Sequence, residues 1–124
     1  MAKKILLIDD EELITRTLAN GLEKIGYEVF VAKNGTDGLI MAEEEVFDLI
    51  ISDIRMPGLN GVETVRNIME SVQKRGLRKT PTIFITGYAD QEIEKQAKGL
   101  KPDAYILKPF DYVDFLKKVK TAIG

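Results

Sequence analysis

The chain has 124 residues, a formal net charge of −2, 44% hydrophobic residues and 31% charged residues, which fits one globular domain. It contains neither cysteine nor histidine, which excludes disulfides, thiolate catalysis, imidazole bases and the usual zinc and haem sites. Any catalysis or metal binding therefore depends on carboxylates, hydroxyls, lysine or the backbone, and carboxylates favour hard cations such as magnesium.

Short apolar runs alternate along the chain with longer segments whose apolar residues recur at helical spacing. The runs predict strands and the periodic segments predict helices, in the order strand Lys4–Ile8, helix Leu13–Ile25, strand Glu28–Ala32, helix Gly35–Val46, strand Asp48–Ser52, helix Val62–Val72, strand Thr82–Ile85, helix Ala89–Lys98, strand Ala104–Leu107 and helix Asp111–Ile123. Continuous apolar strands joined by helices indicate a parallel sheet covered on both faces. With right-handed crossovers, this pattern predicts a doubly wound α/β fold of five strands in the order 2-1-3-4-5 and five helices.

No linker-like tract or internal repeat divides the chain, so residues 1–124 are expected to form one domain. The apolar run near the N-terminus stops at Asp9 and is too short for the hydrophobic region of a signal peptide. No run approaches the ~20 apolar residues of a membrane span. We therefore expect a cytoplasmic protein with no membrane association. The small net charge also gives no argument for direct binding to nucleic acid.

The stretch from Glu70 to Thr80 is basic and indicates a longer third helix or loop. Charge runs of this kind are usually solvated faces rather than binding sites, which is the interpretation that we prefer here. The predicted fourth helix is rich in charged and polar residues, which favours a weak or transient partner surface over a permanent dimer.

Polar residues stand at the carboxyl ends of four predicted strands. Asp9 and Asp10 follow the first strand, Asp53 the third, Thr86 the fourth and Lys108 the fifth. In a doubly wound sheet the functional site lies at this edge, near the switch point between strands 1 and 3. Carboxylates gathered there repel one another, and a magnesium ion relieves the repulsion. An ionised aspartate beside such an ion can attack phosphorus and form an aspartyl phosphate.

Each residue also has a simpler interpretation when it is taken alone. Asp9 and Asp10 suit the N-cap of the next helix, and Asp53 suits a turn. Thr86 could be structural and Lys108 a solvated surface charge. Their convergence at the predicted switch point favours a phosphoryl-transfer site over these alternatives.

Four motifs resemble the receiver domain of two-component response regulators, a flavodoxin-like fold, and together they span essentially the whole chain. They are Ile5-Leu6-Leu7-Ile8-Asp9-Asp10-Glu11, Ser52-Asp53-Ile54-Arg55-Met56-Pro57-Gly58 with Gly61, Ile85-Thr86-Gly87, and Tyr105-Ile106-Leu107-Lys108-Pro109-Phe110. The resemblance implies a signalling phosphoacceptor rather than a conventional enzyme, one that catalyses only its own phosphorylation and dephosphorylation.

The resemblance also implies a role for each site residue. Asp53 is the phosphoacceptor, and Lys108 pairs with a phosphoryl oxygen. Asp10 and Asp53 bind Mg²⁺, with Mn²⁺ as an alternative cation, and Asp9 binds it partly through water. Arg55 contributes its backbone carbonyl to the metal shell.

Thr86 resembles the switch hydroxyl, and Tyr105 the switch aromatic that turns inward when Thr86 moves. The peptide bond before Pro109 is expected to be cis. Arg55 and Tyr88, at the rim of the pocket, are expected to tune the lifetime of the phosphoryl group.

The implied partners are a histidine kinase or phosphotransfer protein and a downstream protein that the sequence does not identify. The surface formed by the fourth helix, fifth strand and fifth helix is expected to carry the signal. The protein is expected to be a monomer or a weak, phosphorylation-dependent dimer. A complete one-domain regulator and a piece of a longer protein both stay open.

Three other classes compete with this interpretation. A phosphatase of the haloacid dehalogenase type needs an acid two residues after its nucleophile, where this chain has Arg55. A flavin-binding module needs a hydroxyl- and glycine-rich phosphate loop after the first strand, where this chain has four acids. An interaction module that signals without phosphorylation is the harder rival, but every residue of the phosphorylation set is present.

Overall fold

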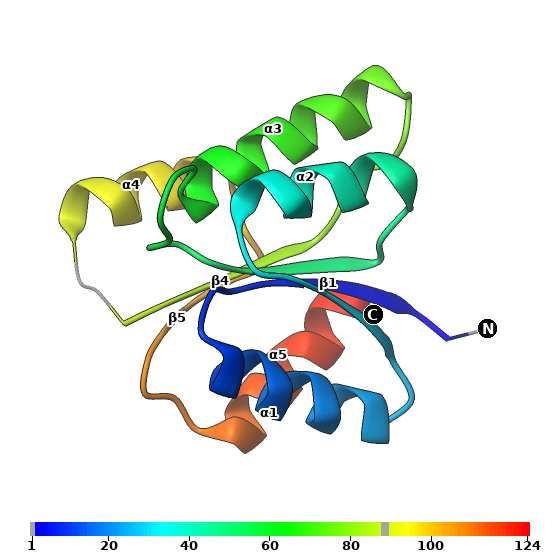
Figure 1. The fold of residues 1–124 in the computed structure, drawn as a ribbon, viewed down its shortest axis with the longest axis vertical. Helices are drawn as coiled ribbons and strands as arrows, with labels where there is room; N and C mark the ends of the chain where they lie inside the picture. Colours follow the sequence, from blue (N-terminus) through cyan, green and yellow to red (C-terminus); the bar gives the residue numbers. More distant parts are fainter. Residues whose placement is uncertain (1, 88–89) are drawn as a thin grey trace.

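Short runs rich in Ile, Leu and Val form a five-stranded parallel sheet in the order β2-β1-β3-β4-β5 (Figure 1). The computed structural model describes residues 2–87 and 90–124. Its elements are β1 Lys4–Ile8, α1 Glu12–Lys24, β2 Glu28–Ala32, α2 Gly35–Glu44, β3 Leu49–Asp53, α3 Gly61–Lys74, β4 Thr82–Thr86, α4 Gln91–Gly99, β5 Ala104–Leu107 and α5 Tyr112–Ile123. The predicted doubly wound fold and its strand order are confirmed.

The sheet separates two apolar layers, because successive side chains of a strand point to opposite faces. Leu6 and Phe84 lie in the layer covered by α2, α3 and α4, and Leu7 and Phe115 lie in the layer covered by α1 and α5 (Figure 1). All four of these side chains are fully buried. None of the helices in the described residues is long and apolar enough to cross a membrane.

Some helix ends differ from those that apolar spacing predicted, and a capping side chain explains one of the differences. The predicted helix from Asp111 begins at Tyr112, because the carboxylate of Asp111 accepts hydrogen bonds from the first turn and makes this residue the N-cap. Asp90 caps α4 in the same way, and the predicted start of that helix at Ala89 lies outside the described residues. Helix α2 ends at Glu44, before the predicted Val46.

The basic stretch after α3 is exposed, as expected, but two of its cations bind the carboxyl ends of other helices. Arg75 donates to the backbone carbonyls of residues 42–43 at the end of α2, at 2.9 and 3.3 Å. Lys79 donates to those of residues 100–101 after α4, at 3.0 and 3.1 Å. Cations are favourable at these ends because the last carbonyls of a helix lack intrahelical partners. A purely solvated face is therefore the wrong description of these two residues.

Candidate functional site

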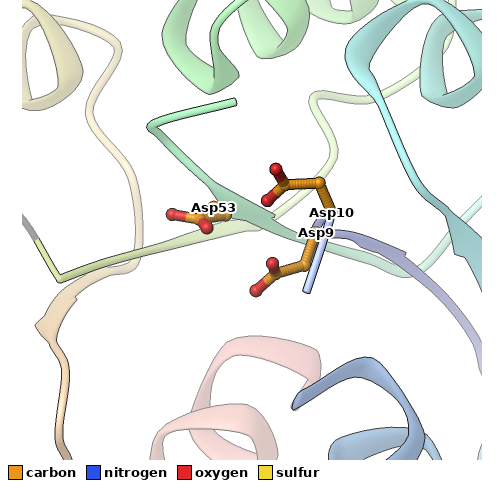
Figure 2. Close-up of side chains that lie close together, drawn as sticks. All are labelled: Asp9, Asp10 and Asp53. Carbon is orange, nitrogen blue, oxygen red and sulfur yellow. The ribbon is translucent and has the colours of Figure 1, made fainter. Parts of the chain in front are cut away.

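Three aspartates meet where the two central strands end. Asp9 and Asp10 follow β1, Asp53 ends β3, and these strands are neighbours in the sheet (Figure 2). One carboxylate oxygen from each aspartate lies within 4.8 Å of the others. Asp9 and Asp53 are 0% and 3% exposed, whereas Asp10 is exposed. The site is thus a buried pair of acids with a third acid at the solvent side.

The ammonium group of Lys108 joins these acids from the end of β5. Its Nζ lies 3.2 Å from Oδ2 of both Asp9 and Asp53, and 3.0 Å from Oε1 of Glu11. The backbone N–H of Lys108 donates to the Thr86 carbonyl at 2.8 Å, which fixes the segment beside β4. The sequence interpretation did not assign Glu11 to this site. Its only signal was its place directly after the two predicted metal-binding acids.

The pKa values of the acid Asp9 and of the base Lys108 are both raised, for different physical reasons. Burial raises the pKa of Asp9 to about 6, and the neighbouring charge of Asp53 also raises it. A hydrogen bond from the backbone of Glu11 and the charge of Lys108 lower it, but their effects are smaller in sum. Burial disfavours the charged form of Lys108, but its hydrogen bond to Glu11 and the charges of Asp9 and Asp53 outweigh this and raise its pKa. Lys108 therefore stays cationic at neutral pH.

The donor set fits a hard divalent cation. Oδ1 of Asp53 is buried and has no hydrogen-bond partner within residues 2–87 and 90–124, although its neighbour Oδ2 is paired with Lys108. A buried carboxylate oxygen without a partner is costly unless another group binds it. Magnesium binds through one or two carboxylates together with water and phosphate oxygens, which matches a buried acid beside the exposed Asp10.

The loop after Asp53 depends on close backbone approach. Gly61, the first residue of α3, donates its N–H to the Ile54 carbonyl at 2.8 Å. A Cβ at Gly61 would overlap the backbone carbonyl of Asp53, so glycine is required here. Asn60 caps α3 by accepting a hydrogen bond from the Glu63 N–H at 2.9 Å. These contacts hold the end of β3 in place from the helix side.

The remaining predicted residues lie at or near the same edge. Thr86 is buried at the end of β4, and Tyr105 lies on β5 opposite Phe84. Since Thr86 follows Phe84 by two positions, it shares a sheet face with Tyr105. Arg55 is exposed two residues beyond Asp53, and Tyr88 lies outside the described residues. The peptide bond between Lys108 and Pro109 is cis, as expected.

The simpler interpretations of the aspartates do not match the structure. Glu11, not Asp9 or Asp10, occupies the N-cap position of α1, and no side chain caps that helix. The Asp9 carboxylate instead accepts a hydrogen bond from the Glu11 N–H at 2.9 Å. Asp53 lies within β3, paired in register with Ile85, rather than in a turn.

The doubly wound sheet, with clustered carboxylates and a lysine at the switch point, is the arrangement that the family resemblance predicts. The family model described as response regulator receiver domain matches residues 5–120. The chain therefore belongs to the response regulator receiver domain family, and the family resemblance predicted from the motifs is confirmed.

Relatives and solved structures agree with this assignment. The transcriptional regulatory protein CrdR of Helicobacter pylori is 35% identical over 97% of this chain and 54% of its own length. The CheY-like receiver domain from Methanospirillum hungatei superposes with a TM-score of 0.87 at 34% identity, over 99% of this chain and 94% of that one. TrrA from Thermotoga maritima, solved in complex with Mg²⁺ and BeF, gives a TM-score of 0.81 at 31% identity over 97% and 98% of the two chains. The chain spans about half the length of the curated relatives that it matches.

Proposed function

We propose that Asp53 accepts a phosphoryl group from the phosphohistidine of a histidine kinase or phosphotransfer protein. An oxygen of the Asp53 carboxylate attacks phosphorus, the P–N bond to the histidine breaks, and the imidazole nitrogen leaves with the bonding electrons. Lys108 faces the incoming phosphoryl oxygens and offsets their negative charge. Asp9, Asp10, Asp53 and the backbone carbonyl of Arg55 would hold a Mg²⁺ ion. That ion supplies further charge neutralisation when it is bound.

The observation that carries this proposal is the asymmetric environment of the Asp53 carboxylate. Oδ2 accepts a hydrogen bond from Lys108 at 3.2 Å, whereas the buried Oδ1 has no partner in the part of the chain that the structure describes. Lys108 also pairs with Asp9 and Glu11. Its ammonium group therefore already stands beside Asp53, where it can offset charge on a phosphoryl group. The complex of TrrA with Mg²⁺ and BeF supports the same chemistry in a relative.

We further propose that phosphorylation shifts the position of Tyr105 through Thr86. Among the residues that the structure describes, the buried Tyr105 hydroxyl has no hydrogen-bond partner, so no hydrogen bond of that hydroxyl has to be broken there when the ring moves. Lys98 of α4 lies 5.8 Å from the centre of the ring and pairs with Glu94 at 2.8 Å. A change at Thr86 would thus reach the surface formed by α4, β5 and α5. A partner that binds one arrangement better would read this shift.

Residues 1–124 are proposed to act as one receiver domain, and its output depends on a partner protein or on further domains of the kind that lengthen its relatives. An interaction module that signals without phosphorylation is not favoured, because the carboxylates and the lysine that this chemistry needs are brought together.

The test is incubation with acetyl phosphate and Mg²⁺, followed by intact mass spectrometry. We expect one added phosphoryl group on the parent, loss of the adduct in Asp53→Asn, and no adduct when the metal is chelated. Asp37→Asn is the matched control, since Asp37 is an exposed acid in the first turn of α2 and lies outside the three-aspartate cluster. An adduct that persists in Asp53→Asn would contradict the proposal.

A further inference from the structure

A second pocket lies at the opposite end of the sheet from Asp53. It is lined by residues just before β1, β3 and β4, including Lys3, Asp48 and Pro81, and has a volume of about 360 Å³. In a parallel sheet these amino ends lie on the edge away from the carboxyl ends, so this pocket shares no residue with the phosphorylation site. Its volume falls within the range of about 300–1,000 Å³ that is typical of small-molecule sites.

The pocket has an apolar floor and an apolar rim. Ile50, Ile68 and Val72 contribute buried side chains to it. Val46 and Leu77 stand at the pocket as well, and they are 60% and 39% exposed. Large apolar side chains exposed beside one concave surface are a common feature of binding sites, because a ligand covers them.

The acids at this pocket are already engaged with other groups. Glu45 pairs with the ammonium group of Lys4 at 2.7 Å. Asp48 accepts a hydrogen bond from the backbone N–H of Lys4, also at 2.7 Å. Neither carboxylate is therefore paired with a cation that lines the pocket.

The cations at the pocket outnumber these acids and lack carboxylate partners. Lys3, Arg75, Arg78 and Lys79 line it, and within residues 2–87 and 90–124 none of them forms an ion pair. Arg75 and Lys79 donate only to backbone carbonyls. An anion that enters the pocket would thus meet four cations against two acids, which is an excess of positive charge.

From this combination we propose that the pocket binds a small organic anion, a carboxylate carried on a flat apolar body. The apolar body would cover the exposed side chains of Val46 and Leu77. The carboxylate would face Arg78 and Lys3, whose side chains are exposed and free to adjust. Binding here is independent of phosphorylation, because none of the lining residues belongs to the three-aspartate cluster or contacts Lys108.

The experiment titrates the ¹⁵N-labelled chain with 2-naphthoate in buffer without divalent cations and follows the amide signals by NMR. We expect saturable shifts at residues 45–48 and 77–81 and none at residues 9–11 or 53. The neutral isostere 2-naphthamide should bind more weakly, since it lacks the charge. The double variant Lys3→Gln/Arg78→Gln should weaken naphthoate binding by about five-fold, on the scale of two exposed charge pairs.

Lys74→Gln is the matched control, because Lys74 is an exposed cation at the end of α3 that does not line this pocket. Its affinity for naphthoate should equal that of the parent. The proposal would be overturned if the amide bound as tightly as naphthoate, or if the double variant kept the affinity of the parent. It would also be overturned by shifts confined to the aspartate edge or by the absence of any saturable shift. The phosphorylation assay with acetyl phosphate is separate, so a failure of either proposal leaves the other testable.

Discussion

Replacing Asp9 by Asn should stabilise the metal-free protein at neutral pH. The carboxylate of Asp9 is fully buried, next to the carboxylate of Asp53, and its pKa is raised from 3.8 to about 6. The folded state therefore binds a proton more tightly than the unfolded state. At low pH Asp9 is neutral in both states and the free energy of unfolding is unaffected. As the pH rises from about 4 to about 6, the ionisation of Asp9 lowers the free energy of unfolding.

The size of this effect follows from the same numbers. A rise of about two pKa units corresponds to about 3 kcal/mol at about 1.4 kcal/mol per unit, which we take as the upper limit. That shift already includes the attraction between Asp9 and Lys108, and the amide of Asn does not match the neutral acid in every contact, so we expect a gain of about 1–3 kcal/mol at pH 7. At about pH 4 the parent and Asp9→Asn should differ little, because the folded parent then holds Asp9 in its neutral form.

Urea denaturation of both proteins over this pH range, without divalent cations, measures the difference. Asp10→Asn is the matched control, since Asp10 is exposed and carries no comparable burial cost. Added Mg²⁺ should stabilise the parent and reduce the advantage of Asp9→Asn, because binding to the folded state shifts the equilibrium. A variant less stable than the parent at neutral pH without metal would refute the reasoning. It would mean that the attraction to Lys108 exceeds the cost of burial.

Two further predictions concern packing around the helices. In urea denaturation, Gly21→Ala on α1 should be less stable than Gly99→Ala on α4 by about 1 kcal/mol. A Cβ at Gly21 would overlap the Tyr112 hydroxyl, whereas a Cβ at Gly99 would meet no atom of the described residues within 4 Å. Equal stability of the two variants would show that Tyr112 moves aside without cost. Lys79→Ala should speed hydrogen exchange in α4, because it removes both hydrogen bonds to the carbonyls of residues 100–101, and unchanged exchange would contradict that anchoring role.

Much of the site could be predicted because strand ends align in a parallel sheet. Once the apolar runs were assigned to strands 1, 3 and 5, topology required Asp9, Asp53 and Lys108 to stand at one edge. The structure places Nζ of Lys108 at 3.2 Å from a carboxylate oxygen of each acid. The three residues therefore lie together, as the strand ends predicted. The functional roles of these residues remain proposals.

Long-range side-chain contacts could not be predicted in the same way. The contact between Glu11 and Lys108 joins residues 97 positions apart, and it depends on side-chain conformations that local spacing does not specify. The hydrogen bonds from Arg75 to the end of α2 depend likewise on how α2 and α3 pack. A basic stretch has the same appearance in sequence whether its side chains face solvent or a helix end.

The sequence by itself determined the family, the strand order and the edge at which the acids gather, because hydrophobic periodicity and strand-end chemistry are local properties. Tertiary structure alone decided the electrostatic state of that edge. It buries Asp9 and Asp53 while leaving Asp10 exposed, and among the described residues no group pairs with one oxygen of Asp53. Burial and pairing depend on every element that packs around a residue, and so the pKa of an aspartate cannot be obtained from its neighbours in the chain.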